Sequence, residues 1–151
     1  MKKILIATDG SASSAEAVDF GVELAAEHEA AVIFVYVAPN TDVIPVAGFG
    51  MTGAIVPHEL DAHDCAPLEE AEQIAEQHGV RASSKRLVGN TVDEIVAYAD
   101  SQDVDLIVVG SRGHGALASA LLGSVSRGVL SGSKRPVAII RGLAAVPVEA
   151  S

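Results

Sequence analysis

The sequence predicts an α/β domain built on a single open, doubly wound, five-stranded parallel sheet with helices on both faces. Short apolar runs rich in β-branched residues are typical of strands that are buried on both sides. These runs alternate with segments of helical periodicity, and parallel strands need such crossover connections. The 151 residues suffice for one compact domain and are too few for two ordinary ones. We therefore expect residues 1–151 to form a single domain.

The first part of the chain predicts a strand, a helix and a second strand. The run Lys3–Thr8 is apolar and β-branched, and turn-forming residues 9–11 follow it. Ser13 and Glu16 fit a capping box, and apolar residues then recur at helical spacing for about four turns. The continuous apolar run Ala31–Val37 predicts a second buried strand.

The remaining elements continue the alternation. A helix rich in Glu and Ala is expected over Leu68–Gln77, with Pro67 in its first turn and Gly79 at its end. The later elements are a weaker strand over Val80–Val88, a helix from a Thr91/Glu94 capping box to about Ser101, a strand over Asp105–Val109, a helix from near Ser124 and a last strand over Pro136–Ile140. This order corresponds to a Rossmann-like sheet.

Residues 38–66 do not fit the alternation, because Pro and Gly recur throughout them. A loop of this length in a compact domain is usually functional or mobile. We expect a long mobile loop whose apolar residues cover a pocket or another subunit. A flexible insertion without such a role is the alternative.

Composition and charge exclude several classes of protein. With 49% hydrophobic and 20% charged residues the chain has a globular balance, and no apolar run in it is long enough to cross a membrane. We expect a cytoplasmic protein. The net charge of −10 disfavours general nucleic-acid binding, since phosphate backbones repel acidic surfaces. Residues 106–151 carry a formal charge of +4, so any anion site should lie in this last third.

The segment from Gly110 to Ser126 carries the main functional signal. It follows the carboxyl end of a buried strand, where open parallel sheets bind ligands. Gly110 and Gly113 would form a tight turn lined by amides, because glycine lets the backbone approach phosphate oxygens. A helix beginning near Ser124 would direct free amides and its positive dipole end at an anion. The hydroxyls of Ser124 and Ser126 would add donors.

This pattern resembles the signature of the universal stress protein family, specifically its ATP-binding branch. The signature is Gly, two residues, Gly, nine residues, and Gly followed by Ser or Thr; Gly110, Gly113 and Gly123-Ser124 match every position. The resemblance extends from the opening strand to Pro136-Val137 and so covers nearly the whole chain. It implies a stress-response protein that binds ATP, with Mg²⁺ or Mn²⁺ bound through the phosphates.

The resemblance also implies roles for single residues. Ala7, Thr8 and Asp9 correspond to the segment beside the nucleoside, and Val37 to a backbone contact with adenine. The residues that correspond to the phosphate-binding turn and helix start are Gly110, Arg112, Gly113, Gly123, Ser124, Val125 and Ser126. In the family a proline is common where Thr91 stands.

The last strand, residues 136–141, carries an expectation about assembly. The resemblance implies that this strand closes one edge of the sheet. An apolar strand edge invites aggregation unless it is paired or covered. We therefore expect a homodimer formed through residues 136–141, with a two-fold axis that sets the two strands antiparallel.

Other nucleotide and metal motifs fit less well. A Walker A loop needs Lys after its final Gly, where Ser124 stands. Residues 113–118 formally match a dinucleotide-binding pattern, but no acidic residue lies about twenty positions on. His58 and His63 are five positions apart, a spacing that turns two side chains of a helix away from each other. Cys65 has no evident basic partner, so we expect it to be inert.

These observations predict a nucleotide-dependent binding or regulatory module. We assign no catalytic residue, because beside the phosphate turn the sequence offers only His114 and Asp9 as general bases. A slow ATP hydrolase and an interaction protein with a vestigial pocket are the alternatives. Asp9 would then only start a turn, Arg112 would be a solvated charge, and Ser124 would only cap a helix.

Overall fold

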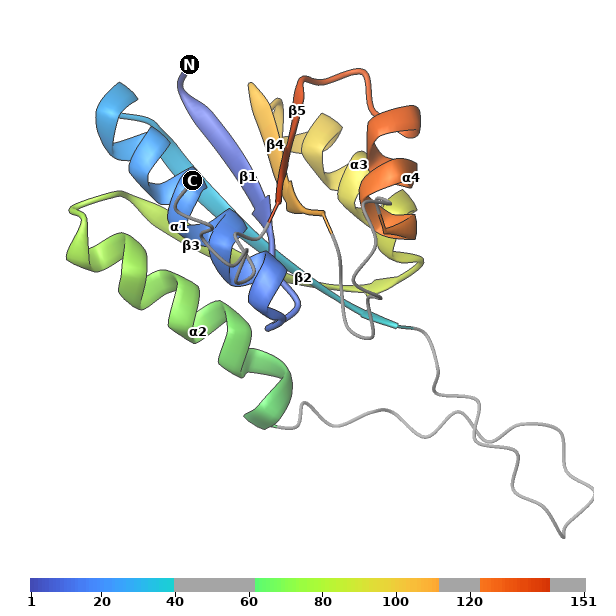
Figure 1. Cartoon of the computed structure of the whole chain (residues 1–151), viewed down its shortest axis with the longest axis horizontal. Helices are drawn as coiled ribbons and strands as arrows, with labels where there is room; N and C mark the ends of the chain where they lie inside the picture. Colours follow the sequence, from blue (N-terminus) through green and yellow to red (C-terminus); the bar gives the residue numbers. More distant parts are fainter. Residues whose placement is uncertain (40–61, 112–122, 142–151) are drawn as a thin grey trace, which may run out of the picture.

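Five strands and four helices alternate along the part of the chain that the structure, a computed structural model, describes (Figure 1). This part comprises residues 1–39, 62–111 and 123–141, with the backbone alone in residues 39 and 62–65. The strands are β1 (Lys3–Ala7), β2 (Ala31–Pro39), β3 (Ala82–Gly89), β4 (Leu106–Gly110) and β5 (Val137–Ile140). The helices are α1 (Ala12–His28), α2 (Ala62–Gln77), α3 (Thr91–Gln102) and α4 (Ser124–Gly132).

The strands form one parallel sheet in the order β3-β2-β1-β4-β5. Helices α1 and α2 cover one face of the sheet, and α3 and α4 cover the other (Figure 1). The predicted open, doubly wound, five-stranded parallel sheet is therefore confirmed. Because all five strands run the same way, their carboxyl ends meet at one edge of the sheet.

The central strand is buried on both faces. In β1, Ile4 and Ile6 pack on the side of α1 and α2, while Leu5 packs on the side of α3 and α4. All three side chains are fully buried, and each such burial contributes roughly 1.5–3 kcal/mol to folding. This two-sided burial explains why the strand is a continuous apolar run with no polar alternation.

Both predicted capping boxes are wrong in position. Helix α1 is capped by Ser11, whose Oγ accepts a hydrogen bond from the Ser14 amide at 3.2 Å. Helix α3 is capped by Asn90, whose Oδ1 accepts from the Asp93 amide at 3.1 Å. The Ser/Thr-x-x-Glu pattern lies one or two positions inside each helix, because a cap needs only a short acceptor side chain on extended backbone.

Helix α2 begins at Ala62, earlier than the predicted Leu68, and contains Pro67 in its interior. A proline removes one helical hydrogen bond but does not determine where the helix begins. The sequence pattern placed the start where the buried apolar residues begin, since Leu68 and Ala71 are core residues. The predicted 38–66 loop is therefore wrong at both ends, because residues 38–39 belong to β2 and residues 62–66 to α2. Its other residues, numbers 40–61, lie outside the described residues.

Helices α3 and α4 approach each other closely at one glycine. A Cβ added to Gly128 of α4 would lie 2.6 Å from Cγ2 of Val92 in α3. Real Cβ atoms do not come so near another carbon, so the missing side chain is required for this packing. Val92 lies in the first turn of α3 and Gly128 in the second turn of α4. The contact thus joins the first turn of α3 to the middle of α4.

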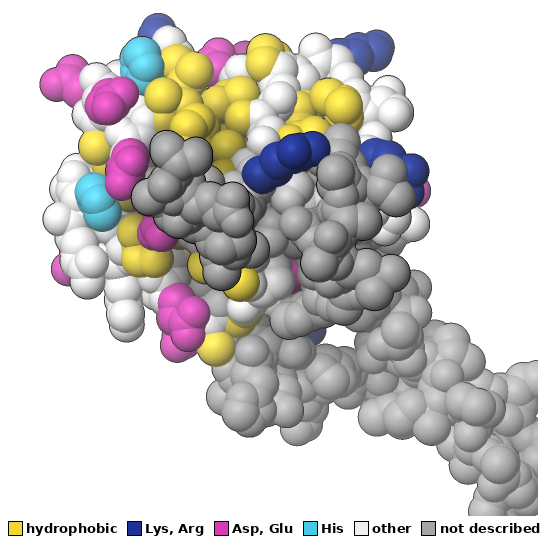
Figure 2. Space-filling model, viewed as in Figure 1, with side chains coloured by type: hydrophobic (Ala, Val, Ile, Leu, Met, Phe, Trp, Pro, Cys, Tyr) yellow, Lys and Arg dark blue, Asp and Glu magenta, His cyan; other side chains and the backbone are white. Residues whose placement is uncertain are grey.

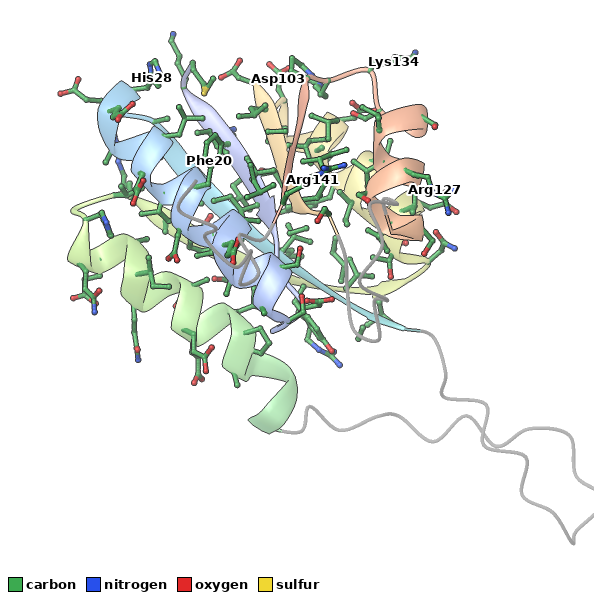
Figure 3. The ribbon with its side chains drawn as sticks, viewed as in Figure 1. Phe20, His28, Asp103, Arg127, Lys134 and Arg141 are labelled. Carbon is green, nitrogen blue, oxygen red and sulfur yellow. The ribbon has the colours of Figure 1, made fainter. Side chains whose placement is uncertain are left out.

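Acidic and basic side chains gather on different parts of the surface. On the face drawn in Figure 2, basic side chains gather around α4 and β5, and many acidic ones lie on the side of α1 and α2. Arg127 and Lys134 point outward at the two ends of α4 (Figure 3). Among the described residues, no helix combines the length and apolar character needed to span a bilayer.

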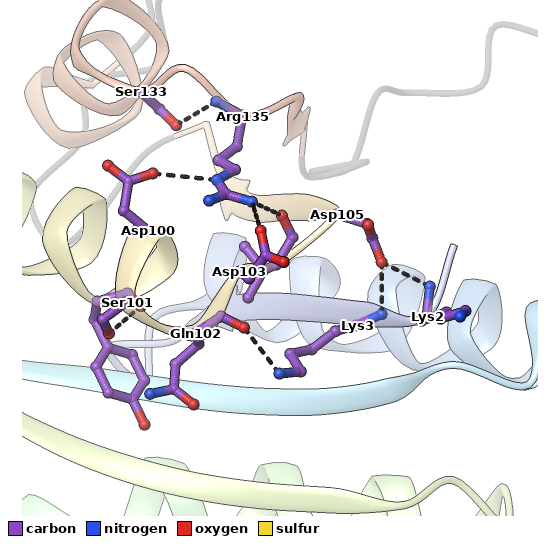
Figure 4. Close-up of polar contacts among 11 residues, drawn as sticks. Lys2, Lys3, Asp100, Ser101, Gln102, Asp103, Asp105, Ser133 and Arg135 are labelled. Carbon is purple, nitrogen blue, oxygen red and sulfur yellow. Dashed lines mark hydrogen bonds and ion pairs between the residues drawn. The ribbon is translucent and has the colours of Figure 1, made fainter.

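Two side chains, Arg135 and Asp105, make hydrogen bonds at the edge of the sheet opposite the strands' carboxyl ends (Figure 4). Arg135 donates to Asp100 Oδ1 at 3.1 Å, Asp103 Oδ1 at 2.7 Å and the Val104 carbonyl at 3.0 Å. It joins the α4–β5 connection to the end of α3. The Asp105 carboxylate accepts from the amides of Lys2 and Lys3 at 2.7 and 3.0 Å. These hydrogen bonds hold the pKa of Asp105 below its ordinary value of 3.8.

Asp105 should therefore contribute a pH-dependent part of the stability. Because folding lowers the pKa of Asp105, its contribution is present above the unfolded-state pKa of about 4 and is lost in more acidic solution. We expect Asp105→Asn to lower the free energy of unfolding at neutral pH, with a difference from wild type that shrinks in acid. Urea unfolding across the acidic range measures this difference. Asp19→Asn on the exposed side of α1 is the control, and an identical pH profile for both variants would contradict the assignment.

Candidate functional site

A cavity of about 530 Å³ opens where β1, β2 and β4 end and where α1, α3 and α4 begin. One part of its wall is apolar and consists of Ala7, Val35, Val37, Ile95 and Val109. The polar part consists of Thr8, Asp9, Ser11, Ser14, Thr91, Ser111, Ser124 and Ser126. Among the described residues of the wall, Asp9 is the only charged side chain. The cavity therefore offers hydroxyls, amides and an apolar surface with little negative charge.

Most of the residues predicted from the sequence line this one cavity. They are Ala7, Thr8, Asp9, Val37, Gly110, Gly123, Ser124, Val125 and Ser126. They come from four separate segments of the chain, which the parallel topology brings to one edge of the sheet. Arg112 and Gly113 lie outside the described residues.

The cavity wall also contains residues that the sequence did not predict as part of the site. They are Ser11, Ser14, Val35, Tyr36, Thr91, Ile95, Val109 and Ser111. Ser111 could have been found, because it lies between Gly110 and Gly113 in the recognised segment. Thr91 and Ile95 could not, since only the packing of α3 against the sheet brings its first turns to the cavity.

The turn between β1 and α1 is held by a small network of hydroxyls and one carboxylate. Asp9 Oδ1 accepts from the Ser11 amide at 2.9 Å, as expected for a turn-forming Asp. Ser14 Oγ donates to the Ser11 carbonyl at 3.0 Å and lies 3.3 Å from both Thr8 Oγ1 and the Asp9 amide. Asp9 therefore stabilises the turn at the start of α1, and it also lines the cavity.

Ser111 joins β4, α4 and β5. Its carbonyl accepts from the Gly123 amide at 2.7 Å and from Ser126 Oγ at 3.2 Å. Its amide donates to the Ile140 carbonyl at 2.8 Å. Ser126 Oγ also donates to the Gly123 carbonyl at 2.9 Å, and the residue is only 1% exposed. In this structure the Ser126 hydroxyl holds the start of α4, and its predicted donation to a ligand stays a prediction.

Three helices begin at the cavity, and their first turns differ. The caps of α1 and α3 are Ser11 and Asn90, and each accepts a hydrogen bond from an amide of the first turn. The cap of α4 is Gly123, which provides no such side chain. Ser124 is therefore the first helical residue and not the cap. The amides of residues 124–126 have no intrahelical acceptor, because they precede the first complete turn.

The first turns of α3 and α4 also differ in their acidic residues. The first turn of α3 contains Asp93 and Glu94, whereas that of α4 contains no acidic residue. An acidic first turn repels a bound anion, and uncapped amides with the positive end of the helix dipole attract one. Of these two helix starts, that of α4 is the one suited to an anion.

Gly110 has a packing role in addition to its place in the wall. A Cβ at this position would lie 2.8 Å from the carbonyl carbon and oxygen of Ser13 in α1. Backbone atoms cannot yield in the way a flexible side chain can, so the first turn of α1 requires glycine here. The sequence pattern indicated only a role in ligand approach for this glycine.

The described residues contain no group of three or more His, Cys, Asp or Glu side chains able to hold a metal ion. His58, the side chains of His63 and Cys65, and residues 113–118 lie outside the described part, so the metal and dinucleotide motifs weighed from the sequence stay untested.

Comparison with known proteins decides the family. The model of the universal stress protein family matches residues 1–141. The chain belongs to the universal stress protein family. It is 34% identical over 142 residues to the universal stress protein MJ0531 of Methanocaldococcus jannaschii, covering 93% of this chain and 82% of that one. It is 35% identical over 148 residues to the universal stress protein YxiE of Bacillus subtilis, covering 92% and 98%.

Solved structures of this family are also similar to the chain. One is a universal stress protein in complex with cAMP, 31% identical, with a TM-score of 0.68 over 92% of this chain and 95% of that one. Another is the universal stress protein from Archaeoglobus fulgidus in complex with dAMP, 25% identical, with a TM-score of 0.62 over 93% and 98%.

Proposed function

We propose that this universal stress protein binds adenine nucleotides, ATP with Mg²⁺ or Mn²⁺ among them, and acts as a nucleotide-dependent binding or regulatory module. The observation that carries the proposal is the start of α4. Its cap, Gly123, has no side chain to bind the first amides, residues 124–126 line the cavity, and their turn contains no acidic residue. A phosphate group is the ligand chemistry that such a helix start prefers.

The apolar part of the cavity supports a base at the other end of the ligand. Val35, Val37 and Ile95 provide a surface against which a flat ring can pack. A volume of about 530 Å³ lies within the usual range of small-molecule sites. The similar structures with cAMP and dAMP support an adenine nucleotide over other anions.

The residues present fit a metal that is bound mainly through the phosphates. Mg²⁺ commonly binds to one or two carboxylates together with substrate phosphates and water. Asp9 is the carboxylate of the described wall, and it would be the protein's contribution to such a site. When bound, the metal would neutralise phosphate charge.

Binding without rapid chemistry is the expected behaviour. In the described wall, Asp9 is the one carboxylate, and its Oδ1 already accepts the Ser11 amide. A base for water attack on a phosphate needs a free, well-placed acceptor. Slow hydrolysis is the alternative at the same site.

The β5 edge supports the expected homodimer. Strand β5 lies at one end of the sheet order, and its four residues are only half-buried. Pro136 and Ile140 direct their carbonyls at β4, so by strand alternation the amides of Val137 and Ile139 point away from the sheet. Phe20 on α1 and Leu130 on α4 are exposed large apolar residues at 41% and 51%.

Ser124→Pro tests the phosphate assignment. Proline is tolerated at the first helical position, and the extended backbone of Gly123 before it suits a proline. The variant removes one uncapped amide, and we expect ATP affinity to fall about ten- to a hundred-fold. Ser124→Ala keeps the amide and should retain most of the affinity. Titration calorimetry with Mg²⁺ present measures both.

Ala12→Pro is the matched fold control for this test. It introduces proline at the first position of α1, and the backbone of the preceding cap, Ser11, is extended as that of Gly123 is. Ala12 does not line the cavity. Unchanged ATP affinity in a folded Ser124→Pro variant would refute the site.

Turnover should be slow or absent. A steady-state phosphate-release assay with saturating ATP should give a rate below the enzyme scale of roughly 1 per second. A rate at or above that scale would refute a binding module and favour the hydrolase.

The dimer should depend on outward-pointing amides of β5. Ile139→Pro removes one such amide, and we expect it to be monomeric at micromolar concentration where the wild type is dimeric. Ile139→Ala loses the same side chain, keeps the amide and should remain dimeric. Sedimentation equilibrium distinguishes the species. A monomeric wild type, or a fully dimeric Ile139→Pro protein, would exclude this interface.

A further inference from the structure

We propose that Thr91 is a specificity-determining residue that hydrogen-bonds the nucleoside half of the ligand. The inference rests on the proposed nucleotide site and concerns the part of its wall that α3 contributes. Thr91 is the first residue of α3, is half-buried and lines the cavity. It lies one turn before Ile95, which belongs to the apolar wall.

The first turn of α3 leaves donors at this position. Asn90 accepts from the Asp93 amide through its side chain and from the Glu94 amide through its carbonyl. The Thr91 amide has no intrahelical acceptor, because it precedes the first complete turn. Within the described part of the chain, the Thr91 hydroxyl also has no hydrogen-bond partner. Thr91 thus offers a neutral donor pair and one acceptor at a cavity wall.

Charge decides what these donors can bind. Asp93 and Glu94 make the start of α3 unfavourable for a second phosphate. An uncharged ligand group with polar edges and apolar faces is compatible with both Thr91 and the apolar residues of the same wall, Val37 and Ile95. A nucleoside has this chemistry, whereas a bare polyphosphate does not. The two helix starts therefore orient the ligand, with its phosphates at the start of α4 and its nucleoside at the start of α3.

The test compares three probes on Thr91→Val, which keeps the shape and the amide but removes the hydroxyl. We expect ATP and adenosine to bind about three- to ten-fold more weakly, the effect of one neutral hydrogen bond. Affinity for inorganic tripolyphosphate should stay unchanged. Thr91→Ser keeps the hydroxyl and should bind all three probes nearly as the wild type does. Ser124→Pro should weaken ATP and tripolyphosphate but not adenosine.

The outcomes separate this inference from the function on which it rests. If wild-type protein binds neither ATP nor adenosine, the proposed function fails. If wild-type protein binds ATP and Thr91→Val binds ATP and adenosine equally well, the nucleotide site stands and the role of Thr91 is refuted. A uniform loss for all three probes would also refute it, because that pattern indicates a structural effect. Circular dichroism melting confirms that each variant is folded.

Discussion

The geometry of the site depends on the hydrogen bonds of a single buried residue, Ser111. Its carbonyl holds the Gly123 amide and the Ser126 hydroxyl, and its amide holds the end of β5. These bonds place the first turn of α4 over the ends of the central strands. Parallel strands would bring some helix start to this edge in any case. Ser111 determines the position of the α4 start relative to the ends of β4 and β5.

The three helix starts at the cavity show how capping divides their roles. A side-chain cap satisfies an amide internally and makes the helix start a structural element. A glycine cap leaves the amides to whatever enters the cavity. In this chain, Ser11 and Asn90 belong to the first kind and Gly123 to the second. All helices share the dipole, so in the proposed site it is the cap that distinguishes the start of α4 from the other two.

The strands and the start of α4 could be predicted because they depend on local composition. Continuous apolar runs specify strands buried on both faces, and Gly123-Ser124 marks a helix start. The caps at Ser11 and Asn90 were missed because a favourable Ser/Thr-x-x-Glu pattern lay just inside each helix. Thr91 and Ile95 were missed because their place at the cavity depends on how α3 packs on the sheet, and no local pattern encodes that packing.

The contact between Gly128 and Val92 has a consequence for the scale of the site. It fixes the separation between the first turn of α3 and the middle of α4. Both helices contribute residues to the cavity wall, and their spacing depends on the absence of one methyl group. In the proposed nucleotide site, this spacing would limit the length of the ligand that fits, although neither Val92 nor Gly128 lines the cavity. A larger residue at position 128 would then change the accepted ligand without any change in the cavity wall.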